Sequence, residues 1–250
     1  MTDTTSKTSS FHRLANPGRF LRFADTIYPW CLGGMLLCFL VGLPLALLIS
    51  PADYQQGDTV RIMYVHVPAA WMALFVYLNL ALASASLLIW RHPLAGIAAQ
   101  SCAPIGAAFT FLALATGSLW GKPMWGTWWE WDPRLTSFLI LLLFYIGYMA
   151  LWSAIEDPDS AADLTGFLCL VGSVFALLSR YAVLFWNQGL HQGASLSVAP
   201  GERMSAVYRY PLYLSMLGFF LLFLALLLIR TRTQIRRRRL AALQAREMRP

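Results

Sequence analysis

The chain has 250 residues, of which 58% are hydrophobic and only 12% are charged, and its formal net charge is +7. Soluble domains carry about 25% charged residues. The composition therefore excludes an ordinary soluble domain and predicts a protein that lies in a lipid bilayer.

Six segments are long and apolar enough to cross a bilayer, since a crossing helix needs roughly 20 such residues. They run approximately over residues 30–49, 67–90, 94–119, 135–155, 164–186 and 211–229. Lipid cannot satisfy open backbone groups, and no alternating strand pattern appears, so each segment is predicted to be a helix. We expect an all-α integral membrane protein with one six-helix domain over residues 30–229, an N-terminal segment 1–29 and a basic tail 230–250.

The basic residues predict the orientation, because they favour the cytoplasmic side of a membrane. With both termini cytoplasmic, 13 of the 19 Lys and Arg residues fall inside. The outer loops are then about 50–66, 120–134 and 187–210. The arginine-rich tail is expected to contact anionic lipid of the inner leaflet.

Residues 120–132, WGKPMWGTWWEWD, hold five of the ten tryptophans of the chain; we call them the tryptophan segment. Pro123 can begin a helix, and the spacing of Trp125, Trp128, Trp129 and Asp132 is that of one helical face. We therefore expect a short interfacial helix that presents three indoles together. The alternative is an aromatic belt that only fixes depth in the membrane. Asp132, just before Pro133, is also expected to cap the next helix.

Two of the four histidines, His66 and His191, fall in outer loops on either side of the tryptophan segment, whereas His12 and His92 fall inside. A single histidine at such a place is usually only solvated or interfacial. As a pair beside a flat aromatic surface, they suggest two axial ligands of a haem iron. The haem propionates would need cations, and guanidinium groups bind carboxylates with two parallel bonds. The candidates on the outer side are Arg61, Arg134, Arg203 and Arg209.

The sequence WGKPMWGTWWEWDPRLTS, residues 120–137, resembles the WWD motif of the haem-handling proteins of cytochrome c maturation. YVHVPAAW around His66 and LHQGAS around His191 extend the resemblance over nearly the whole chain. It is closest to the haem exporter protein C family, the C component of the system I pathway. The related F component and the system II protein share the motif but are much longer.

The resemblance implies a protein that binds haem b as transient cargo at the outer face of the bacterial inner membrane. It would present this haem to a periplasmic haem chaperone, the E component. Its other partners would be the A and B subunits of an ABC transporter complex and a small single-span D component. By position, His66 and His191 would be the axial ligands, and Arg61 and Arg134 the propionate partners. The haem and chaperone surface would comprise Trp120, Trp125, Trp128, Trp129, Trp131 and Asp132.

No catalytic motif appears in the chain, so a haem-transfer protein is expected rather than an enzyme, with no nucleic-acid partner. One rival class is a membrane redox enzyme with haem inside the bundle, but none of the histidines lies mid-span. The other is a permease subunit that moves haem itself across the membrane. Its weak support comes from polar residues and prolines within spans, which are Pro44, Asn79, Gln100 and Pro104. The four cysteines form no CxxC pair, which argues against covalent haem attachment and thiol–disulfide exchange.

Overall fold

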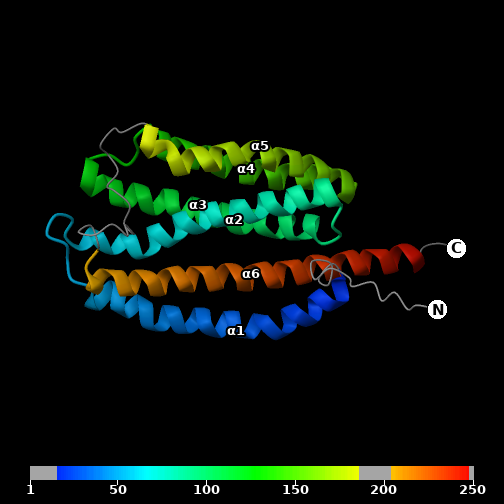
Figure 1. Cartoon of the computed structure of the whole chain (residues 1–250), viewed down its shortest axis with the longest axis horizontal. Helices are drawn as coiled ribbons and strands as arrows, with labels where there is room; N and C mark the ends of the chain where they lie inside the picture. Colours follow the sequence, from blue (N-terminus) through cyan, green and yellow to red (C-terminus); the bar gives the residue numbers. More distant parts are fainter. Residues whose placement is uncertain (1–15, 186–203, 248–250) are drawn as a thin grey trace, which may run out of the picture.

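The computed structural model describes residues 16–185 and 204–247, and its helices lie side by side with alternating directions (Figure 1). All six helices are long and apolar enough to cross a membrane, which confirms the predicted all-α membrane architecture. The helices are α1 (Pro17–Pro44), α2 (Met63–Trp90), α3 (Ala95–Trp125), α4 (Pro133–Ala154), α5 (Pro158–Phe185) and α6 (Ala206–Glu247). A π-helical turn, η2 (Leu45–Ile49), follows α1, and a 3-10 turn, η3 (Asp58–Ile62), precedes α2.

The bundle has two distinct ends. Residues 50–62 and 126–132 connect helices at one end, which we call the tryptophan end. The α2–α3 and α4–α5 connections lie at the other, the arginine end, where α6 also continues beyond the other helices (Figure 1). Of the helices, α3 is the most central, because it contacts α2, α4, α5 and α6.

Buried tyrosines connect the helices at the middle of the bundle. The Tyr77 hydroxyl on α2 donates to the Cys169 carbonyl of α5 at 3.0 Å, and the Tyr145 hydroxyl on α4 donates to the Ala73 carbonyl of α2 at 2.9 Å. The two rings meet edge to face with centroids 5.0 Å apart. Since a buried hydroxyl without a partner is costly, these two bonds fix how α4 and α5 lie against α2.

The longest extensions past the boundaries predicted from hydropathy are those of α1 and α6, and both lie at the arginine end. Residues 17–29, predicted as part of a separate N-terminal segment, are the first turns of α1, which the Asn16 side chain caps through the Gly18 N–H at 2.8 Å. Residues 230–247, predicted as a basic tail, continue α6. Arg232 of α6 pairs with Asp25 of α1 at 2.7 Å, so these charged extensions stabilise each other.

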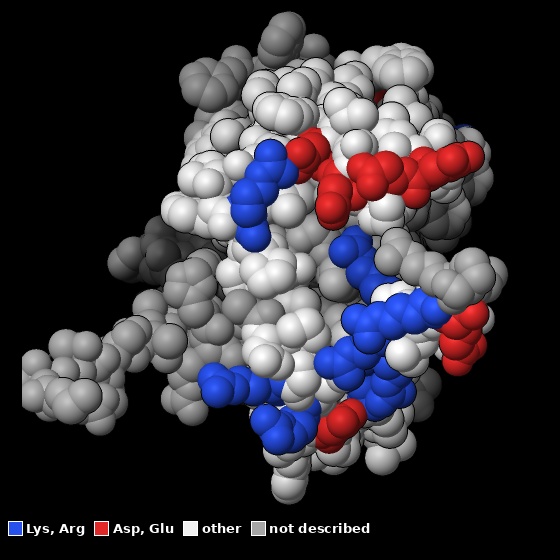
Figure 2. All heavy atoms as spheres, turned by 90° about the vertical axis from the view of Figure 1, so that its right-hand side faces the viewer, with Lys and Arg blue, Asp and Glu red and all other residues white. Residues whose placement is uncertain are grey.

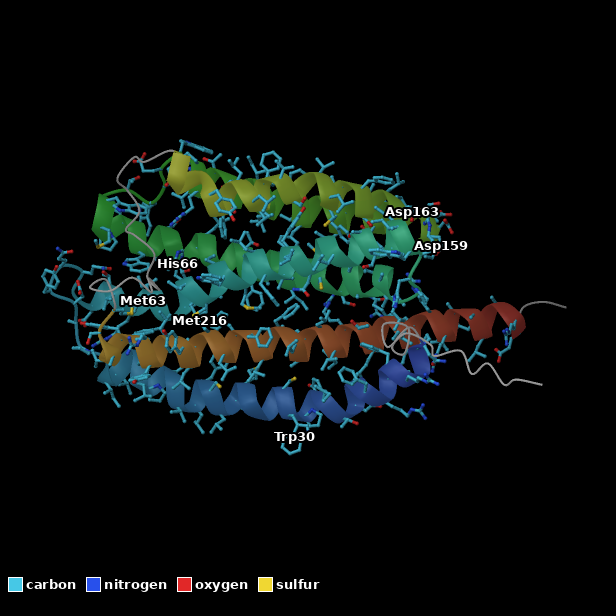
Figure 3. The ribbon with its side chains drawn as sticks, viewed as in Figure 1. Trp30, Met63, His66, Asp159, Asp163 and Met216 are labelled. Carbon is cyan, nitrogen blue, oxygen red and sulfur yellow. The ribbon has the colours of Figure 1, made fainter. Side chains whose placement is uncertain are left out.

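Charges at the arginine end are separated (Figure 2). Arginine side chains gather over α1 and α6, whereas acidic side chains form a row over the α4–α5 connection and the start of α5 (Figures 2 and 3). Arg91 lies at this row and pairs with Asp163, and this pairing raises the pKa of the Arg91 guanidinium. The acidic row also carries Glu156, Asp157 and Asp159.

The two prolines within predicted spans, Pro44 and Pro104, have different surroundings. Pro44 ends α1 and is followed directly by the π-helical turn η2, so the regular helix changes there. Pro104 lies within α3, which continues as one helix from Ala95 to Trp125.

Replacing Gly106 with Ala is expected to lower the stability of the bundle by about 1–3 kcal/mol, the usual effect of overpacking. A Cβ atom at Gly106 would lie 2.1 Å from Cζ of the buried Tyr145 ring. The matched control is Gly33→Ala on α1, where a Cβ would meet no atom within 4 Å. Thermal unfolding of the purified proteins in nanodiscs compares the two. Equal unfolding temperatures for both variants would contradict the packing described here.

Candidate functional site

His66 lies in the first turns of α2, at the tryptophan end, and its half-buried ring faces α3 (Figure 3). It was predicted to lie in the loop before the second span, but α2 begins three residues earlier, at Met63. Nδ1 of His66 lies 3.0 Å from the Ala113 carbonyl oxygen and 3.1 Å from the Thr116 hydroxyl. The ring also meets the Trp120 indole edge to face, with centroids 5.7 Å apart.

The residues that contact His66 form one face of α3. Their positions follow the i, i+3, i+4, i+7 spacing of a helical stripe. Gly117 also belongs to this face, because a Cβ atom there would lie only 3.0 Å from Cε1 of His66. We call this stripe the imidazole contact face; it comprises Ala113, Thr116, Gly117 and Trp120.

The prediction of a short separate helix in the tryptophan segment is wrong. Helix α3 continues through Pro123 to Trp125, and residues 126–132 are not helical. Gly126 ends the helix with φ of 77°, a left-handed conformation that glycine adopts readily. Since Trp125 precedes this break while Trp128 and Trp129 follow it, the expected common face of three indoles does not exist.

The tryptophans instead divide into a packed and an exposed set. The Trp120 indole N–H donates to Gln56 Oε1 at 2.9 Å, and the Trp125 ring lies over Gly121, where a Cβ would be 2.9 Å from Cε3. Trp128 and Trp131 are 56% and 74% exposed. The segment therefore presents part of its indole surface outward and uses the rest for packing.

Neighbouring side chains hold the exposed set. The Trp129 ring is half-buried and meets Trp131 edge to face, with centroids 5.4 Å apart. Lys122, in the last turn of α3, donates to the Gly126 carbonyl at 2.9 Å and lies 5.9 Å from the Trp128 ring centroid. This cation–π contact joins the non-helical residues to the end of α3.

Asp132 is the N-cap of α4, as predicted. Its side chain is only 4% exposed, and Oδ1 accepts the Leu135 N–H at 2.6 Å, while Pro133 occupies the first helical position. The positive end of the helix dipole also stabilises a carboxylate at this place.

The predicted arginines have partners of their own. Arg61 donates to the Ser50 carbonyl at 3.0 Å and pairs with Asp58 at 3.1 Å, so it organises the turn before α2. Arg134 is half-buried in the first turn of α4, and Arg209 lies 5.7 Å from the Tyr210 ring centroid. His191 and Arg203 lie outside the described residues.

The residues that fix the imidazole and indoles were not predicted from the sequence. Gln56, Thr116 and Lys122 each hold a member of the site. Gln56 and Thr116 lie outside the tryptophan segment, and Lys122 lies within it but was not among the predicted site residues. Thr116 lies four positions before Trp120, so continuing the helix past residue 119 would have placed both on one face.

Known proteins resemble the chain over nearly its whole length. A protein-family model described as Heme exporter protein C matches residues 10–246. The protein of that name from Paracoccus denitrificans (strain Pd 1222) is 67% identical over 240 residues, covering 96% of this chain and 99% of the relative.

The chain belongs to the heme exporter protein C family.

Other family members are more distant but match a similar length. The Rhodobacter capsulatus protein is 56% identical, over 95% of this chain and 98% of its own. The Escherichia coli (strain K12) protein is 43% identical, over 90% of this chain and 91% of its own. The range matched by the family model includes the imidazole contact face, the tryptophan segment and His191.

Asp132→Ala is expected to destabilise this family member by about 1 kcal/mol, because the Leu135 N–H loses its acceptor. Asp132→Asn keeps an acceptor oxygen and should therefore retain most of the stability that Asp132→Ala loses. Thermal unfolding followed by far-ultraviolet circular dichroism measures both changes. Glu130→Ala, at an exposed carboxylate of the same segment, is the control and should leave the unfolding temperature unchanged. A wild-type unfolding temperature for Asp132→Ala would contradict the capping role.

Proposed function

We propose that this protein binds haem b at the outer face of the bacterial inner membrane and transfers it to a periplasmic haem chaperone during c-type cytochrome maturation. The observation that carries the proposal is the contact between His66 and Trp120, the first residue of the tryptophan segment. The family supports it, because each relative described above is named heme exporter protein C.

The described side chains at the tryptophan end fit a haem. Exposed indoles such as Trp128 and Trp131 offer flat apolar faces to a porphyrin ring. Two buried N–H groups at this end, Nε of Arg61 and Nε1 of Trp129, have no hydrogen-bond partner among the described residues. A propionate carboxylate would satisfy such donors, and a buried donor without an acceptor is unfavourable.

The work of the chain would be to hold and orient this cargo. His66, together with His191 as the resemblance implies, would bind the iron, and Arg61 and Arg134 would bind the propionates. The exposed indoles would support the ring and receive the chaperone. The chain would contribute orientation rather than a reactive group, so we propose a transfer protein and not an enzyme. The proposed partners are the chaperone (E component), the A and B subunits of an ABC transporter and the D component.

The charge distribution supports an outward tryptophan end. Arg19, Arg22 and Arg91 lie at the opposite end of the bundle, together with the arginines that follow Ile229 in α6. Positively charged residues favour the cytoplasmic side. The start of α1 and the end of α6, both at the arginine end, would then be cytoplasmic.

The packing favours transfer over translocation of haem through this chain itself. A translocation pathway would require a polar site near the middle of the bundle. Tyr77 and Tyr145 fill that region. Asn79, one of the residues that suggested a pathway, donates to the Phe75 carbonyl of its own helix at 2.8 Å.

His66→Ala is expected to abolish or change the Soret band of the purified protein while the six-helix bundle still forms, because the iron loses an imidazole ligand. His191→Ala should have the same effect. The matched control is His92→Ala at the arginine end, where His92 Nδ1 accepts the Leu94 N–H at 3.3 Å. An unaltered haem content and spectrum in the His66/His191 double variant would refute the ligand assignment.

Replacing both Trp128 and Trp131 with Ala is expected to reduce haem loading of the chaperone by about tenfold or more, since buried aromatic contacts dominate binding surfaces. The thermal stability of the protein should change little, because both indoles are largely exposed. Trp30→Ala is the control, since Trp30 is 77% exposed on α1, away from the tryptophan end (Figure 3). Covalent haem on the chaperone, measured by haem staining, reports the result. Wild-type loading by the double variant would contradict the proposal.

A further inference from the structure

The hydrogen bonds of His66 determine which of its ring nitrogens carries the proton. Nδ1 lies 3.0 Å from the carbonyl oxygen of Ala113, and a carbonyl oxygen only accepts hydrogen bonds. The group that donates must therefore be Nδ1 itself.

The second partner agrees, because the single proton of the Thr116 hydroxyl is directed elsewhere. Thr116 Oγ1 donates to the Leu112 carbonyl of its own helix at 2.6 Å. At the 3.1 Å contact with Nδ1 the same oxygen therefore acts as an acceptor. Both neighbours of Nδ1 are acceptors, so Nδ1 carries a proton, and in the neutral ring the lone pair is then on Nε2.

The contact face also limits rotation of the ring. A Cβ atom at position 117 would lie 3.0 Å from Cε1, so the imidazole would have to shift by a few tenths of an ångström to make room for it. One turn further along α3, the Trp120 indole meets the imidazole edge to face. The ring is therefore held both by hydrogen bonds at Nδ1 and by steric contact at its carbon atoms.

We propose that Thr116 is a positioning residue, which together with the Ala113 carbonyl holds His66 as its Nδ1–H tautomer and so presents Nε2 to the haem iron. The inference rests on the proposed function in one respect, namely that His66 binds haem. A ligating histidine that donates its other N–H to a fixed acceptor has its tautomer and orientation set and becomes a more basic ligand. A more basic ligand favours ferric over ferrous haem and lowers the midpoint potential.

The test compares two substitutions that differ in one group. Thr116→Val keeps the branched shape but removes the hydroxyl, whereas Thr116→Ser keeps the hydroxyl. In nanodiscs loaded with haemin, Thr116→Val is expected to bind about tenfold more weakly, the lower end of the range for such outer partners, because the Ala113 carbonyl remains. Its midpoint potential should rise. Thr116→Ser should stay within about twofold of the wild type in affinity and keep its potential.

A direct measurement of the tautomer needs no haem. In the haem-free wild-type protein labelled with ¹⁵N-histidine, the His66 signals, assigned by their loss in His66→Gln, should show a protonated Nδ1 and an unprotonated Nε2. A proton on Nε2 would overturn the inference even if Thr116→Val does not fold. Wild-type haemin affinity and potential in a folded Thr116→Val protein would overturn it as well.

These outcomes are separable from failure of the proposed function. If His66→Ala loses haem while Thr116→Val behaves as the wild type, His66 remains a ligand and the role of Thr116 is refuted. If His66→Ala keeps the wild-type spectrum, the assignment of His66 as a ligand is refuted, and so is the proposal that Nε2 faces the haem iron.

Discussion

The close approach of α3 to its neighbours determines where every element of the candidate site lies. Small residues form a stripe along α3 at alternating spacings of three and four, which keeps them on one side of the helix. Such residues let helix backbones pack closely where lipid offers no hydrophobic driving force. At Gly106 the space is filled by the Tyr145 ring, and at Gly117 by the His66 ring. The stripe comprises Ala99, Ala103, Gly106, Thr110, Ala113 and Gly117.

The tryptophan end is where this regular packing stops and aromatic surface begins. Full burial of an indole is worth up to about 5 kcal/mol, at about 25 cal/mol per Å² over some 200 Å². Trp120 obtains much of this burial free energy by packing against α2 and Gln56, whereas more than half of the surface of Trp128 and of Trp131 is exposed. Each of the exposed indoles therefore retains about 3–4 kcal/mol for a flat apolar ligand, a partner protein or lipid headgroups.

The sequence predicts those parts of the fold that depend on local chemistry. The six spans follow from apolar runs of sufficient length, and the Asp132 cap follows from its place before Pro133. The helix ends are missed, because α1 and α6 continue as charged helices that pair through Asp25 and Arg232, residues about 200 positions apart. Hydropathy alone carries no sign of such a pair.

The site is predicted less completely, for two physical reasons. In the tryptophan segment the helical spacing is real, but Gly126 in a left-handed conformation interrupts it, and a glycine just past a helix end is a known stop signal. The partners of His66 are 47 and 50 positions away on another helix. Only the packing of α2 against α3 brings them together, so the motif residues are recognisable from sequence while their supporting contacts are not.

The imidazole contact face and the first turn of the tryptophan segment are consecutive turns of a single helix, which ends only at Trp125. Lys122 then joins the exposed Trp128 to the last turn of that helix through its contacts with the Gly126 carbonyl and the indole ring. The exposed indoles and the contacts of His66 are therefore joined by one rigid element. Because packed helices shift as units rather than bend locally, a force on the exposed indoles would reach the imidazole contact face through α3.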